Sequence, residues 1–60
     1  MEMAKITEYA RALYDAHGDK AEAEAARKAR QFEDSGDTAQ SEQWRGIQAA
    51  IKMMRAPSQG

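Results

Sequence analysis

Two short segments of the sequence decide the fold: YDAHGD at residues 14–19 and FEDSGD at residues 32–37. Each consists of an aromatic residue, three further residues and the dipeptide Gly-Asp. Glycine readily adopts the left-handed backbone conformation that follows a helix C-terminus, and aspartate is a favoured N-cap residue. Both segments are therefore predicted to end one helix and to begin the next.

The sequence on either side of these two turns is rich in good helix formers: Ala, Glu, Lys, Arg and Gln. Pro57 ends the last of these stretches, because proline cannot continue a helix. The turns and the proline together predict helices at about residues 2–17, 20–35 and 38–55.

These helices form a single domain in our interpretation. Glu22 and Gln40 follow their aspartates by three residues, where a capping box has its second member. Connections this short make neighbouring helices run antiparallel. We expect an all-α, up-down-up three-helix bundle over residues 1–56, followed by a flexible tail at residues 57–60.

The apolar residues form a stripe of different width on each predicted helix. The first helix has a wide stripe, widened by two tyrosines: Met3, Ile6, Tyr9, Ala10, Leu13, Tyr14 and His17. The second has a narrow stripe of small residues: Ala21, Ala25, Ala29 and Phe32. The third is wide again: Trp44, Gly46, Ile47, Ala50, Ile51, Met53 and Met54.

The two wide stripes exceed what the thin middle helix can cover. Either the outer helices turn toward each other within one chain, or the surplus packs on a second copy and gives a dimer of helical hairpins. Large residues at the stripe edges then have two interpretations, as the rim of the core or as contacts to a partner. The candidate partner-binding residues are Tyr9, Tyr14, Trp44, Ile51 and Met53.

The second turn resembles the turn between the two helices of a tetratricopeptide repeat. The resemblance covers about half of one repeat, on Phe32, Gly36 and Asp37. Ser41 stands where the repeat has alanine, and Arg45 where it has a further aromatic residue. It implies antiparallel helix pairing and peptide binding. The chain is also similar to short uncharacterised bacterial helical proteins, which implies no function.

Little in the sequence points to catalysis or to a cofactor. There is no cysteine, and His17 is the single histidine, so no combination of these residues predicts a metal site. Its position in the last turn of the first helix predicts a structural role, favoured by the helix dipole. Phosphate-binding loops and nucleophile motifs are missing too. We expect no enzyme activity, no cofactor and no small-molecule substrate.

The basic residues give an alternative function. Arg27, Lys28 and Arg30 are expected to be a solvated face paired with Glu24. A second strip, on the third helix, would suit a small nucleic-acid-binding regulator: Arg45, Gln48, Lys52 and Arg55. The net charge of −1 and the pI of about 5.7 make nucleic acid the weaker alternative.

The sequence thus predicts a protein–protein interaction module: an adaptor, a regulator or a self-associating subunit that uses the apolar edges of the first and third helices. We expect no membrane association, because the 42% hydrophobic content is mostly alanine and no apolar run approaches a spanning length. A secretory signal is not recognised at the start, so the cytoplasm is the expected compartment.

Overall fold

The computed structural model describes residues 3–55, which form three α-helices in the described part: α1 (Met3–His17), α2 (Lys20–Asp34) and α3 (Thr38–Arg55). Their bounds agree with the predicted ones to within a residue. The predicted tail at residues 57–60 lies outside the described residues.

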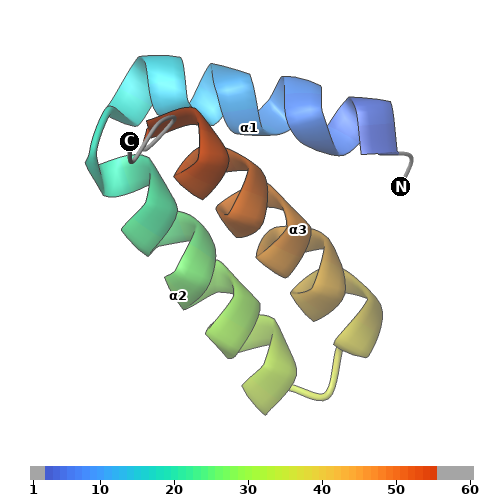
Figure 1. The fold of residues 1–60 in the computed structure, drawn as a ribbon. Coiled ribbons are helices and arrows are strands. Elements are labelled where there is room, and N and C mark those ends of the chain that lie inside the picture. Colours follow the sequence, from blue (N-terminus) through green and yellow to red (C-terminus); the bar gives the residue numbers. More distant parts are fainter. Residues whose placement is uncertain (1–2, 56–60) are drawn as a thin grey trace.

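The three helices form a bundle in which α3 packs against both of the others. Figure 1 shows α2 and α3 side by side and antiparallel. Helix α1 lies at an angle to this pair, near the end where α2 begins and α3 ends. Moving away from the turn that joins them, α1 and α2 diverge, and α3 runs between them (Figure 1). The predicted all-α three-helix bundle is confirmed.

The core is built mainly from small side chains. The predicted alanine stripe of α2 is confirmed, since Ala21, Ala25 and Ala29 are fully buried. Among the described residues, the largest fully buried side chains are those of Ile47 and Ile51 in α3. Other large residues are only partly covered and surround this core: Ile6, Leu13, Tyr14, Trp44 and Met54.

The turn between α2 and α3 has the predicted capping. Gly36 has a φ of 86°, and the Asp37 N–H donates to the Phe32 carbonyl at 2.8 Å in a Schellman arrangement. The Asp37 carboxylate accepts a hydrogen bond from the Gln40 N–H at 3.2 Å, as an N-cap should. Because the Asp37 N–H is already bonded, the Gln40 side chain is not its partner, and the capping-box prediction is wrong there.

The turn between α1 and α2 differs from this one, although the two sequences are alike. Gly18 has a φ of 61° and its N–H donates to the Tyr14 carbonyl at 2.7 Å, as predicted for a helix end. Asp19, however, has helical dihedrals (φ −63°, ψ −18°) and makes no capping hydrogen bond. An N-cap residue needs an extended backbone, so the predicted Asp19 cap with Glu22 is wrong.

Gly46 allows α1 and α3 to approach closely. A Cβ atom built at this position would lie 3.3 Å from Cδ1 of Ile6 in α1. This contact is tight, but Cδ1 is the flexible end of a half-buried side chain and can yield by a few tenths of an ångström.

The same substitution at two glycines is therefore expected to have opposite effects. Gly46→Ala should raise the free energy of unfolding by up to about 1 kcal/mol, because alanine is favoured over glycine inside a helix. Gly36→Ala should lower it by about 1–2 kcal/mol, because the left-handed conformation is strained for any residue with a Cβ. Urea unfolding followed by circular dichroism measures the free energy of unfolding of both variants. If the two substitutions change it in the same direction, the roles assigned to Gly46 and Gly36 are wrong.

Candidate functional site

One cluster of side chains joins all three helices at the surface. The rings of Tyr9 (α1) and Trp44 (α3) pack edge to face, with centroids 5.6 Å apart and planes at 87°. The Lys28 ammonium (α2) lies 5.9 Å from the centroid of the Trp44 ring, within reach of a cation–π contact. We call Tyr9, Lys28 and Trp44 the aromatic cluster. Tyr9 is 48% exposed and Trp44 is half-buried.

Beside the aromatic cluster, one carboxylate has an ion-pair partner among the described residues and two cations do not. The Glu24 carboxylate lies 3.1 Å from Nδ1 of His17 and joins α2 to the end of α1. Within residues 3–55, no carboxylate lies within ion-pair distance of Lys28 or Arg27. Both cations line a shallow hollow of about 350 Å³ on α2, together with Gln31 and Glu24.

Two sequence-based expectations change at this point. The sequence pattern predicts that Glu24 pairs with Lys28 or Arg27 along α2, but Glu24 contacts His17 of the neighbouring helix instead. The helical spacing predicts that His17 lies on the apolar stripe of α1, yet its side chain is 43% exposed and contacts a carboxylate. Its structural role is therefore a polar contact between helices.

The structure separates the predicted partner-binding residues. Tyr9 and Trp44 are brought together, but Ile51 is 0% exposed, so the prediction that it contacts a partner is wrong. Its position at the centre of the α3 stripe places it against α1 and α2. Tyr14 is half-buried against the core.

Met53 is the most exposed large apolar residue of the described part, at 77%. It follows Trp44 by nine residues on α3. At 3.6 residues per turn this spacing amounts to about 180° around the helix. Met53 and the aromatic cluster therefore lie on opposite sides of α3 and cannot form one continuous patch.

Lys28 is the member of the cluster that the sequence did not single out as a site residue. Its position at the edge of the alanine stripe is the signal in the sequence that points to it. An edge residue on α2 necessarily lies near one of the two neighbouring helices, and Trp44 is the neighbour that it meets.

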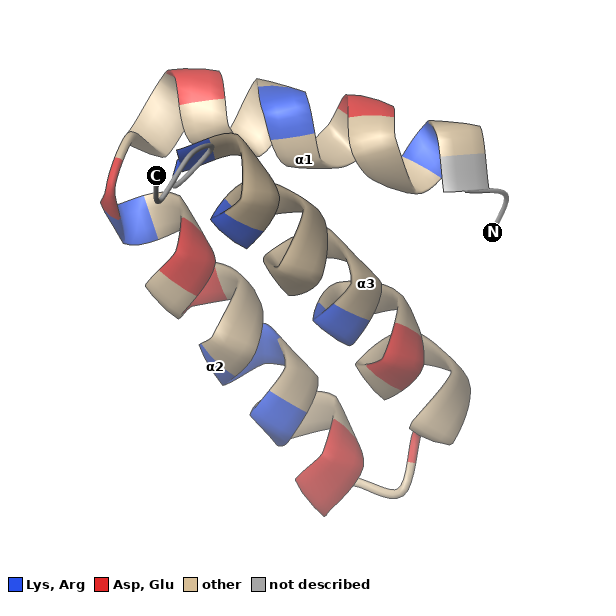
Figure 2. Ribbon diagram, in the orientation of Figure 1, with Lys and Arg blue, Asp and Glu red and all other residues tan. Residues whose placement is uncertain are grey.

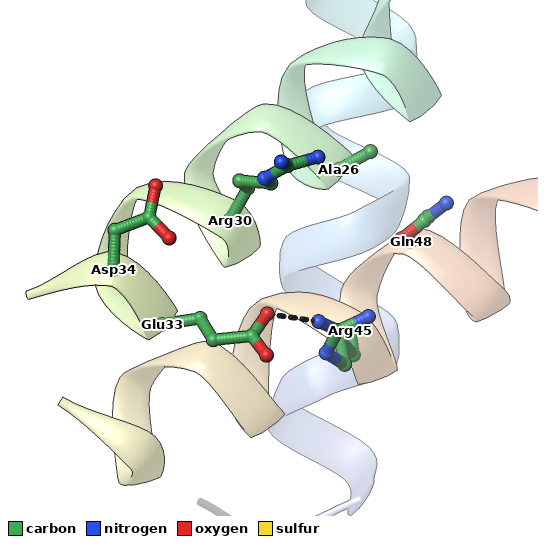
Figure 3. Close-up of a pocket in the computed structure, with 6 residues that line it drawn as sticks. All are labelled: Ala26, Arg30, Glu33, Asp34, Arg45 and Gln48. Carbon is green, nitrogen blue, oxygen red and sulfur yellow. Dashed lines mark hydrogen bonds and ion pairs between the residues drawn. The ribbon is translucent and has the colours of Figure 1, made fainter. Parts of the chain in front are cut away.

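The basic strip of α3 is interrupted by carboxylates of α2. Arg45 pairs with Glu33 at 2.5 Å, and Arg55 pairs with Glu22 at 2.6 Å. The hydrogen bond and the charge of Glu22 raise the pKa of Arg55 above its ordinary value. The Arg45–Glu33 pair lines a hollow of about 430 Å³. Figure 3 shows the pair together with the other lining residues: Ala26, Arg30, Asp34 and Gln48.

Charges of both signs are distributed over the whole bundle. Figure 2 shows blue and red segments on each of the three helices, and none carries a single sign. Among residues 3–55, no group of three or more His, Cys, Asp or Glu side chains is placed to hold a metal ion. None of the described helices has the length and apolar character needed to cross a membrane.

Comparison with known proteins gives no relative. No family model matches the chain, and no match is found among the curated proteins or the solved structures. The candidate site therefore rests on the geometry of the chain's own residues.

The two ion pairs between α2 and α3 should differ in strength. A double-mutant cycle on Arg45 and Glu33, with both residues replaced by glutamine, should give a coupling energy below about 1 kcal/mol, because both side chains are more than half exposed. The Arg55–Glu22 cycle should give the larger coupling, because Glu22 is only 20% exposed. Thermal unfolding of the single and double variants measures both energies. An equal or smaller coupling for Arg55–Glu22 would contradict this ranking.

Proposed function

We propose that this chain is a protein–protein interaction module and that the aromatic cluster is its contact surface. The observation that supports the proposal is the position of Tyr9 and Trp44. They are two large aromatic side chains from different helices, packed edge to face and left partly exposed. Aromatic residues are enriched in protein interfaces, and tyrosine and tryptophan dominate binding energies there.

The construction of the cluster supports the same conclusion. Each residue comes from a different helix, so the folded bundle fixes the positions of the rings before a partner arrives. A contact surface that is already ordered loses less conformational entropy on binding. In this proposal the chain acts by docking, and none of its residues is assigned a catalytic role.

The nucleic-acid alternative has less support. Two of the three cations in its strip, Arg45 and Arg55, are already paired with carboxylates of α2. A phosphate group at these positions would have to displace Glu33 or Glu22 and would meet their negative charge. Proteins that bind nucleic acids usually present an uninterrupted basic surface instead.

Photo-cross-linking tests the proposed contact surface. A benzoylphenylalanine residue placed at Tyr9 keeps an aromatic ring at the cluster, and the same residue at Ala23 is the control, because Ala23 is exposed on α2. On irradiation in the cells that express the chain naturally, the Tyr9 position should give discrete adducts and Ala23 should not. Mass spectrometry of the adducts identifies the cross-linked protein, whether a second copy or another chain.

The proposal predicts a difference between these two positions, and it fails if Tyr9 yields no adduct above the level seen from Ala23. Sedimentation velocity at two protein concentrations accompanies the experiment. A sedimentation coefficient that increases with concentration would identify the chain itself as a partner.

A further inference from the structure

The cationic rim of the aromatic cluster restricts the chemistry of a partner. Lys28 lies over the Trp44 ring, and Arg27 and Gln31 line the same hollow on α2. Glu24, the acidic residue in that lining, already contacts His17. Two cations beside one carboxylate give this side of α2 a net positive charge, and carboxylates on a partner segment would match it.

The backbone of the bundle restricts the partner's shape. Peptides that bind by adding a strand need an exposed sheet edge, and residues 3–55 contain only helices and turns. Helices, in contrast, dock through apolar side chains on one face against the surface of other helices. The aromatic cluster offers apolar rings from α1 and α3, of which Tyr9 is 48% exposed, as the surface for such a helix.

We infer that the aromatic cluster binds an acidic amphipathic helix of another protein. An apolar side chain of that helix packs on Tyr9 and Trp44, and carboxylates on its flank pair with Lys28 and Arg27. This inference rests on the proposed function and specifies its partner by chemical class.

Selection from a displayed library of random peptides tests the partner class without a known ligand. The full chain is the bait, and the enriched peptides are sequenced. We expect an excess of Asp and Glu beside apolar residues spaced three or four positions apart. Synthetic copies of the enriched peptides are then titrated against the chain, with the fluorescence of Trp44 as the signal, because it is the single tryptophan of the sequence.

Two pairs of matched variants locate the binding site. Lys28→Glu and Tyr9→Ala should each weaken binding of the enriched peptides by about tenfold or more. Lys52→Glu makes the same charge change on α3, and Met53→Ala removes an exposed apolar side chain on the opposite side of α3. Both controls should change the dissociation constant by less than about twofold. All four residues are exposed, so circular dichroism should show the fold unchanged.

The outcomes separate this inference from the proposed function. The inference of an acidic helix is wrong if basic or proline-rich peptides are enriched, or if Lys28→Glu leaves peptide binding unchanged. Neither result contradicts the proposed interaction module. If the chain self-associates and Tyr9→Ala abolishes this, a second copy of the chain binds the aromatic cluster, and the inference of an acidic helix from another protein is wrong. If no peptide is enriched and Tyr9 gives no cross-link, both the inference and the proposed function fail.

Discussion

The close packing of α3 on the alanine stripe of α2 is the contact on which the rest of the structure depends. Ala21, Ala25 and Ala29 are buried without projecting far from the backbone, so the two helices can lie close together. This proximity brings Glu22 and Glu33 within reach of arginines on α3, and it places Lys28 over Trp44. Larger residues in the stripe would separate the helices and break all three contacts.

A core of small residues also determines what remains at the surface. Ile47 and Ile51 fill the space that the alanines leave, and the rings of Tyr14 and Trp44 are only partly buried around this core. Trp44 is therefore held at the boundary, with one neighbour from each of the other helices. The close packing of small side chains that stabilises the hairpin of α2 and α3 therefore also leaves the aromatic cluster at the surface.

The sequence predicted the helices well because their signals are local: glycine, alanine content and apolar spacing. It predicted two similar turns and failed at Asp19, because the backbone there is already helical and its carboxylate cannot cap. It paired Tyr9 with Trp44 in one surface, but it also included Ile51 and Met53. Their separation depends on which side of α3 each neighbour occupies, and the position of a neighbouring helix is not encoded in a single-helix pattern. The ion pairs between α2 and α3 were missed for the same reason.

The contribution of all three helices to the aromatic cluster links its occupancy to folding. A ligand that touches Tyr9, Lys28 and Trp44 together finds its complete site only while α1 rests on the other two helices. Ligand binding therefore shifts the equilibrium away from conformations in which α1 has detached and toward the complete bundle. If the proposed function holds, the free energy of unfolding increases as the ligand concentration rises above the dissociation constant, and the folded population of the bundle then depends on the abundance of the partner.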